Sequence, residues 1–176
     1  MGPRLLFICL FIFSISYSQK ESSPYIIVLG TIQDAGSPHM GCEKSCCITL
    51  FKNPDPNRKV VSLGLVDPLE KKYWLIEASP DFITQCRDLK TISNFEHAKS
   101  PDGIFLTHAH IGHYTGLMYL GKESYNSRDV PVFAMTRMKG FLIKNGPWSQ
   151  LFKINNIKIN NINHQEEIKL SNNLSI

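Results

Sequence analysis

Residues 107–113 read Thr107-His108-Ala109-His110-Ile111-Gly112-His113. This run holds three of the six histidines of the chain. The apolar residues Ile104–Thr107 lead into it and predict a short buried strand. The imidazoles of His108 and His110 project together from an extended or tightly turned segment, and His113 can join them once the chain turns into a helix. Because neutral imidazole is a preferred ligand of zinc and also binds iron, we predict a metal site at these three histidines.

The rest of the chain alternates between strand and helix patterns. Apolar, β-branched runs predict strands at Tyr25–Leu29, Val60–Val66, Tyr73–Ala78, Ile104–Thr107, Val130–Met135 and Ile154–Ile159. Ser79, Pro80 and Asp81 supply an N-cap, a first-turn proline and a first-turn acid for a helix over about residues 80–90. A second helix is predicted at Thr136–Lys144. The first three strands suggest a meander, and the whole pattern predicts a mixed α/β domain.

The composition is that of a globular domain. The chain has 176 residues, of which 43% are hydrophobic and 19% are charged. Its net charge of +4 comes without any run of Lys or Arg longer than a pair. Nucleic-acid binding needs denser phosphate neutralisation than this. We therefore expect a small-molecule substrate rather than DNA or RNA, and the composition leaves the oligomeric state open.

The amino-terminal residues have the pattern of an export signal. Arg4 precedes the apolar stretch Leu5–Ile15, and Ser16-Tyr17-Ser18 is a small-x-small pattern that a signal peptidase cuts. The stretch is short for a membrane span, which needs about 20 residues. We expect residues 1–18 to be a removed signal peptide and residues 19–176 to form a periplasmic or secreted domain without a membrane contact. An uncleaved amino-terminal anchor is the alternative.

The histidine run resembles the H-x-H-x-D-H signature of the metallo-β-lactamase superfamily, and Gly116-Leu117 match the Gly-Leu that follows it. The resemblance implies an α/β fold of the αββα four-layer sandwich type, with the carboxyl-terminal part missing from this chain. It also implies that His108 and His110 hold one metal ion. Gly112 stands where the family has the aspartate that helps His113 to hold a second ion. Loss of that oxygen ligand implies a single metal ion or a weak second one.

The loop after the first strand contains three closely spaced cysteines, Cys42, Cys46 and Cys47. It resembles the amino-terminal loop of the branch formed by the coenzyme PQQ synthesis protein B family and the related phosphonate-pathway cyclic phosphodiesterases. There, a C-x-C-x-x-C cluster is associated with a structural zinc ion, although a lysine replaces the middle cysteine here. We predict a structural metal with His39 as the nearest fourth ligand. A disulfide, for instance with Cys86, is the alternative that export favours.

Four further residues are weaker candidates. If the cysteine loop folds over the site, as the resemblance implies, Asp34 and His39 contact the metal ligands or the substrate. Glu77 falls where many superfamily members have aspartate, and it either orients a ligand histidine or is a solvated strand end. His164 is the only histidine after the cluster, and its Asn/Gln-rich setting predicts a loop.

The function implied by the resemblance is that of a metal-dependent hydrolase. One or two zinc ions, or iron, would activate water for attack on an ester, phosphodiester or lactam-like bond. Two alternatives stay open. One is a role in PQQ (pyrroloquinoline quinone) biosynthesis with oxidative metal chemistry. The other is a non-catalytic metal- or ligand-binding module, which the glycine at position 112 would permit.

Overall fold

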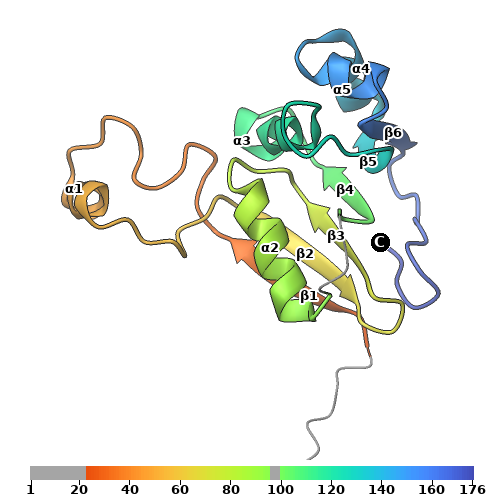
Figure 1. The fold of residues 1–176 in the computed structure, drawn as a ribbon, viewed down its shortest axis with the longest axis horizontal. Helices are drawn as coiled ribbons and strands as arrows, with labels where there is room; N and C mark the ends of the chain where they lie inside the picture. Colours follow the sequence, from red (N-terminus) through yellow and green to blue (C-terminus); the bar gives the residue numbers. More distant parts are fainter. Residues whose placement is uncertain (1–22, 96–99) are drawn as a thin grey trace, which may run out of the picture.

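A six-stranded sheet forms the centre of the computed structural model, which describes residues 23–95 and 100–176. The order of the strands in space is their order along the chain (Figure 1). The strands are β1 (Tyr25–Gly30), β2 (Ser62–Asp67), β3 (Lys72–Ile76), β4 (Gly103–Leu106), β5 (Val130–Met135) and β6 (Ile157–Ile162). The helices are α1 (Ser45–Lys52), α2 (Phe82–Ser93), α3 (Ile111–Tyr114), the 3-10 helix η1 (Thr115–Leu120), α4 (Thr136–Lys144) and α5 (Trp148–Lys153).

The sheet is antiparallel in its first half and parallel in its second half. β1 pairs with β2 and β2 with β3 in antiparallel fashion, which confirms the predicted meander. β3, β4, β5 and β6 pair in parallel. The connections follow from this, because parallel neighbours need a crossover. α2 connects β3 to β4, α3 and η1 connect β4 to β5, and α4 and α5 connect β5 to β6.

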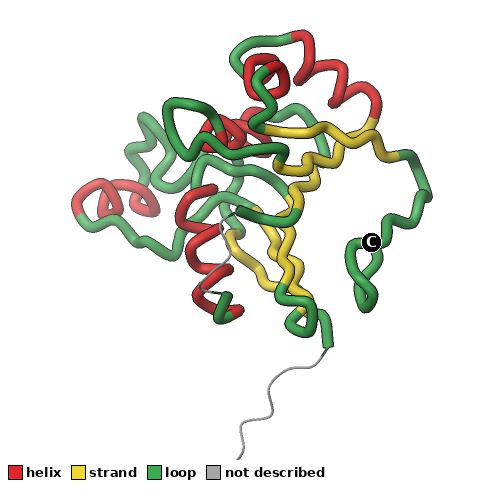
Figure 2. The backbone as a smooth tube through the Cα atoms, turned by 45° about the vertical axis from the view of Figure 1, so that its right-hand side comes forward, coloured by secondary structure: helices red, strands yellow, loops and turns green. Residues whose placement is uncertain are grey.

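The sheet carries an apolar layer on each face. Alternate strand residues such as Leu75 and Ile104 pack with Leu89 of α2 and Leu117 of η1, and all four are 0% exposed. On the other face, a smaller cluster around Trp74 is covered by apolar residues of the carboxyl-terminal segment. Figure 2 shows the strands between the helices and this segment. The predicted α/β fold class is confirmed, and within the described ranges the chain supplies one sheet and one helical layer of the four-layer sandwich.

Several predicted boundaries need correction. β5 and α4 have the predicted limits, but α1 and α5 were not predicted. β6 begins at Ile157 rather than Ile154, because Ile154 is the C-cap of α5 and Asn155 has a left-handed backbone with φ 60°. α2 begins at Phe82 rather than residue 80. Ser79 closes a turn in front of the helix by accepting a hydrogen bond from the amide of Asp81.

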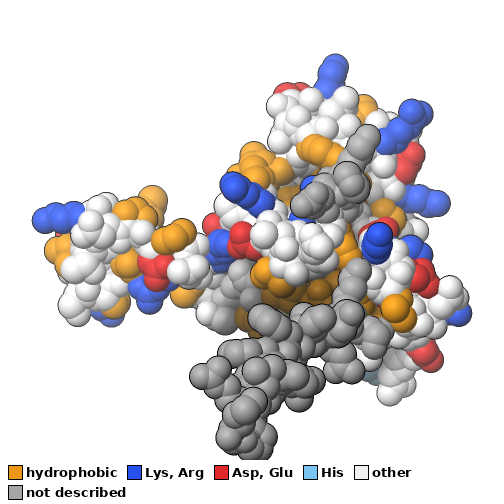
Figure 3. Space-filling model, turned by 60° about the horizontal axis from the view of Figure 1, so that its bottom comes forward, with side chains coloured by type: hydrophobic (Ala, Val, Ile, Leu, Met, Phe, Trp, Pro, Cys, Tyr) orange, Lys and Arg blue, Asp and Glu red, His pale blue; other side chains and the backbone are white. Residues whose placement is uncertain are grey.

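The segment with α1 extends away from the sheet. Figure 3 shows it as a lobe on one side of the molecule. Its apolar side chains at Met40, Ile48 and Phe51 are 89%, 53% and 55% exposed. The lobe therefore contributes little to the main core, and its shape depends on local contacts and on its cysteines.

The predicted signal peptide, residues 1–18, lies outside the described residues. Among the helices of residues 23–95 and 100–176, none combines the length and the apolar character that crossing a membrane requires. Export of the protein stays a prediction.

Asp67, at the end of β2, anchors the carboxyl-terminal segment to the sheet. Its buried carboxylate accepts hydrogen bonds from the amides of Leu69 and Glu70 and from the side chains of Ser171 and Asn173. Burial acts to raise the pKa of Asp67, but these hydrogen bonds outweigh burial and hold the pKa below its ordinary value. The ionised form is therefore part of the folded structure.

Acidification is expected to release residues 168–176 from the sheet. Because the folded state lowers the pKa of Asp67, its carboxylate stabilises the fold above the unfolded-state pKa, and this contribution is lost as the pH falls through the folded-state pKa. We expect Asp67→Asn to produce the same release at neutral pH. The amides of Ile168 and Ile176 donate to each other's carbonyl oxygens, so faster hydrogen exchange at these two amides would report the release. Unchanged protection in Asp67→Asn, with the exposed Asp129→Asn as control, would contradict this role.

Candidate metal centre

The three predicted histidines gather at the carboxyl ends of β3 and β4. The two strands end side by side, since Ile76 pairs with Phe105. His108 and His110 lie in the segment after β4, and His113 lies in α3 (Figure 1). The ring centroid of His108 is 4.6 Å from that of His110 and 4.1 Å from that of His113. The structure therefore brings the three rings close together, although His110 is not in the group of side chains whose ligand atoms converge, and the metal site stays a prediction.

Glu77 belongs to the same cluster. It follows β3 and is only 4% exposed, so the alternative of a solvated strand end is wrong. One ligand atom each from Glu77, His108 and His113 lie within 4.8 Å of one another. The Oε1 atom of Glu77 is 3.4 Å from Nδ1 of His113. These distances make Glu77 either a metal ligand or a residue that orients one.

The backbone around Glu77 connects the ligand-bearing segments. Glu77 has a left-handed φ of 76°, a conformation that costs a non-glycine residue about 1–3 kcal/mol and is common at functional sites. Its amide donates to the carbonyl oxygen of Phe105 at 2.8 Å. The next amide, of Ala78, donates to the carbonyl oxygen of His113 at 2.9 Å. The end of β3 is thus bonded both to β4 and to α3.

Thr107 orients the ring of His108. The Thr107 hydroxyl donates its hydrogen to Oε1 of Glu77, and its oxygen lies 2.8 Å from Nδ1 of His108. Because a hydroxyl has a single hydrogen, the Thr107 oxygen accepts from Nδ1–H of His108. In the neutral ring, this tautomer leaves the lone pair on the other nitrogen, Nε2. The chain Glu77–Thr107–His108 therefore orients Nε2 as the nitrogen of His108 that could bind a metal ion.

Removal of the Thr107 hydroxyl is expected to weaken metal binding. In Thr107→Val, the ring of His108 loses its orienting contact, and we expect an affinity loss of about 10- to 100-fold for zinc. Titration of the intact protein against a competing chelator measures the affinity. Thr107→Ser keeps the hydroxyl and should therefore bind zinc with the affinity of wild type. Equal zinc affinities for Thr107→Val and wild type would contradict the role of the hydroxyl.

The side chains of the cluster fit a divalent metal ion. Nδ1 of His113 is buried and has no hydrogen-bond partner within residues 23–95 and 100–176. Its 3.4 Å separation from Glu77 is longer than a charge-assisted hydrogen bond, which is about 2.7–2.9 Å. Leaving a buried ring nitrogen without a partner costs free energy. Imidazole nitrogens and a carboxylate are also the ligands that zinc takes in proteins.

The loop between β1 and α1 reaches the cluster at Asp34. Oδ2 of Asp34 is 3.8 Å from Nδ1 of His110. The structure thus places Asp34 beside a predicted ligand. His39 is exposed, and its Nδ1 lies 2.9 Å from the carbonyl oxygen of Met40. His39 and the exposed His164 belong to neither of the two ligand clusters of the described residues.

The three loop cysteines form the second cluster. Cys42 and Cys47 are disulfide-bonded, and Sγ of Cys46 lies 3.9 Å from Sγ of Cys47. The alternative of a bond to Cys86 is wrong, because Cys86 is free and lies in α2. All three sulfur atoms lie within 4.8 Å of one another. A structural metal would need the thiolates that the disulfide uses, so the two states exclude each other, and the structural metal stays a prediction.

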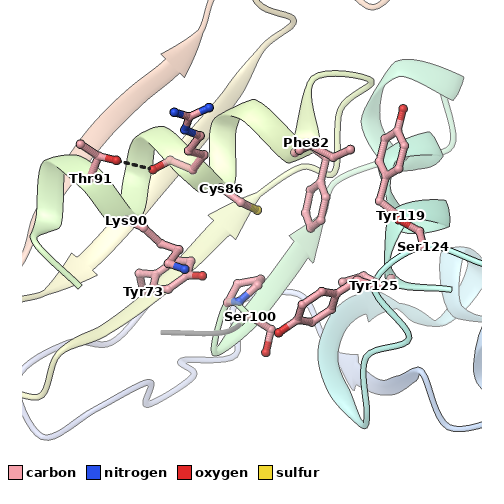
Figure 4. Close-up of a pocket in the computed structure, with 13 residues that line it drawn as sticks. Tyr73, Phe82, Cys86, Lys90, Thr91, Ser100, Tyr119, Ser124 and Tyr125 are labelled. Atoms are coloured by element: carbon pink, nitrogen blue, oxygen red, sulfur yellow. Dashed lines mark hydrogen bonds between the residues drawn. The ribbon is translucent and has the colours of Figure 1, made fainter. Parts of the chain in front are cut away.

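A cavity of about 680 Å³ lies apart from both clusters, between α2 and the residues that follow η1 (Figure 4). Its lining includes Tyr73, Phe82, Cys86 and Tyr125, and no histidine is among the described residues that line it. Burial raises the pKa of the Cys86 thiol to about 12. A neutral thiol is a poor nucleophile and a poor metal ligand. This cavity therefore offers no reactive thiolate, and the candidate metal ligands lie in the histidine cluster.

The fold and the cluster together define a mixed α/β domain with side chains that could hold a metal ion at the carboxyl ends of its strands. A profile of the beta-lactamase superfamily domain matches residues 73–176. The chain therefore belongs to the beta-lactamase superfamily, as the histidine run predicted. Its family is of the metal-dependent hydrolase type.

Two solved structures share the fold. Zinc-bound PqqB from Methylobacterium extorquens is 22% identical with a TM-score of 0.66, and the match covers 85% of this chain and 53% of PqqB. A diphosphatase from the PhnP family is 24% identical with a TM-score of 0.59, and the match covers 83% of this chain and 52% of the diphosphatase. The chain thus spans about half the length of each. No curated protein matches it significantly.

Proposed function

We propose that this chain carries the metal-binding histidines of a zinc-dependent hydrolase that acts on phosphodiesters or diphosphates. The observation that carries the proposal is the convergence of Glu77, His108 and His113 within 4.8 Å at the carboxyl ends of β3 and β4. A zinc ion held there would lower the pKa of bound water to about 7 and polarise a substrate oxygen.

The residues of the chain have separate tasks in this proposal. His108 and His113 bind the metal, and Glu77 and Thr107 hold them in position. His108 and His110 are exposed, whereas His113 is largely enclosed, with 12% of its side chain accessible. The cluster therefore opens to solvent on the side of His108 and His110, and a substrate would approach from that side.

Two relatives in fold support the choice of metal and substrate. The PqqB structure was solved with zinc, and the other neighbour is a diphosphatase. We therefore rank phosphodiesters and diphosphates before carboxylic esters and lactam-like bonds. The PqqB likeness also favours a second candidate, a role in PQQ biosynthesis with oxidative chemistry, which would require a redox-active metal such as iron.

The test combines metal analysis with a substrate panel. The intact protein is purified without added metal, analysed for zinc and iron, and assayed with bis(p-nitrophenyl) phosphate, p-nitrophenyl acetate and a chromogenic lactam. We expect zinc, preferential hydrolysis of the phosphodiester, loss of hydrolysis after chelation and recovery after zinc is restored. Iron without hydrolysis would favour the oxidative role. Bound zinc without hydrolysis of any substrate would leave a non-catalytic metal-binding module.

A further inference from the structure

The space for a side chain at position 112 is filled by Asp34. A Cβ atom added to Gly112 would lie 2.0 Å from Cβ, 2.5 Å from Cα and 2.9 Å from the carbonyl oxygen of Asp34. Two of these three atoms are backbone atoms, so rotation of a side chain cannot relieve the contact. Only glycine at position 112 is compatible with Asp34 in its present place. The Cβ of Asp34 lies 2.0 Å from the place that the Cβ of an aspartate at position 112 would take.

The Asp34 carboxylate faces the histidines. Its Oδ2 atom is 3.8 Å from Nδ1 of His110, and two-thirds of the Asp34 side chain is shielded from solvent, since its exposed fraction is 33%. Among the described residues, Nδ1 of His110 is the one basic side-chain nitrogen within 4.0 Å of the Asp34 carboxylate. A carboxylate in this place is thus positioned to bind a cation together with imidazoles.

The backbone holds Asp34 in this position. The amides of Thr31 and Ile32 donate to the carbonyl oxygen of Lys59 at 3.1 and 3.0 Å. Further along the loop, the amide of Gly36 donates to the carbonyl oxygen of Gln33 at 3.0 Å and closes a turn that contains Asp34. The carboxylate is therefore presented by a turn whose entry is bonded to the segment just before β2, and binding a cation would require little ordering of the chain.

We propose that Asp34 supplies, from the loop after β1, the carboxylate ligand of a second divalent cation that position 112 cannot supply. The cation would lie between Asp34 and the imidazoles of the cluster. This inference rests on the proposed function, because it assumes that the histidines hold a first metal ion. It replaces the expectation of a single or weakly held metal, which followed from the glycine at position 112.

An exchange of the acid between the two positions tests the proposal. Asp34→Asn keeps the shape of the side chain but removes its charge. Asp34→Gly/Gly112→Asp moves the carboxylate to position 112 and removes the Asp34 side chain, but the Cα atom and the carbonyl oxygen of residue 34 must still move to make room for the new Cβ atom. Glu43→Gln, an exposed acid of the same loop, is the matched control. The intact proteins are titrated with Co²⁺, and the stoichiometry, the two dissociation constants and the visible absorption of bound cobalt are recorded.

Asp34→Asn is expected to weaken the second Co²⁺ at least about tenfold, with little change in the first. The exchange variant should regain second-site affinity once the backbone of residue 34 moves away from position 112, and Glu43→Gln should resemble wild type. A wild-type histidine cluster that saturates with one Co²⁺ would overturn the proposal. So would equal second-site affinities for Asp34→Asn and wild type.

The titrations distinguish a wrong role for Asp34 from a failure of the proposed function. If Asp34→Asn leaves both cobalt ions in place while His108→Ala/His110→Ala removes metal, only the role of Asp34 is wrong. If neither set of variants changes cobalt binding, the histidine site is wrong as well. The Asp34→Asn titration decides the question even if the exchange variant does not fold, because the single variant leaves the contact between the loop and Gly112 intact.

Discussion

His108→Ala/His110→Ala is expected to abolish the metal-dependent hydrolysis that we propose, with a fall in kcat/KM on the order of 10³-fold or more. The double variant removes two of the three imidazoles at the carboxyl end of β4. It should also lose the metal bound by the cluster, as elemental analysis will show. Both rings are exposed, so the free energy of unfolding of the metal-free protein should change by no more than about 0.5 kcal/mol.

The chain offers a matched control for this variant. His39 and His164 are also exposed, but they lie outside the ligand clusters of residues 23–95 and 100–176. His39→Ala/His164→Ala should therefore keep the metal and the activity of wild type. The proposed centre would be wrong if the control lost as much metal as His108→Ala/His110→Ala, or if the latter kept wild-type metal content.

Gly116→Ala is expected to destabilise the fold by about 3 kcal/mol. A Cβ atom at position 116 would lie 2.2 Å from the carbonyl oxygen of Ser79 and 2.9 Å from that of Ala78. The amide of Gly116 also donates to the Ala78 oxygen at 2.8 Å, which fixes the close approach. Because the Ala78 amide in turn donates to the carbonyl oxygen of His113, separation of these segments should weaken metal binding as well.

Urea unfolding of the metal-free protein measures the change in stability, and cobalt titration measures the change in affinity. Gly140→Ala is the control, because Gly140 lies in α4 and a Cβ atom there would have no neighbour within 4 Å. That variant should be stabilised by up to about 1 kcal/mol, because alanine favours the helix. Equal stabilities of Gly116→Ala and wild type would show that the segment around Ser79 can shift without cost.

The histidine centre could be predicted from the sequence because its ligands are close together along the chain. His108, His110 and His113 lie within one short segment, and a buried strand leads directly into it. Glu77 was ambiguous, since its burial depends on the parallel pairing of β3 with β4. The steric contact between Asp34 and Gly112 could not be derived, because it joins residues far apart in sequence and depends on the path of a loop.

The missed helices have a different cause. α5 has six residues and α1 has eight, and segments so short show too few turns for their periodicity to be recognised. α1 also contains Cys46 and Cys47, whose spacing suggested a metal-binding loop rather than a helix. By contrast, Val130–Met135 and Thr136–Lys144 were predicted with correct limits, because each has an uninterrupted apolar pattern of the right period.

The order of the strands in space has a consequence for how the protein forms during translation. Because each strand from β2 onward pairs with the one made just before it, every newly synthesised strand meets a partner that has already left the ribosome. The β1–β3 meander can thus act as a template for the later, parallel strands, whose pairing is intrinsically slow. Glu77 is made before the histidines, so the side chains of the candidate metal centre can come together in the order in which they are translated.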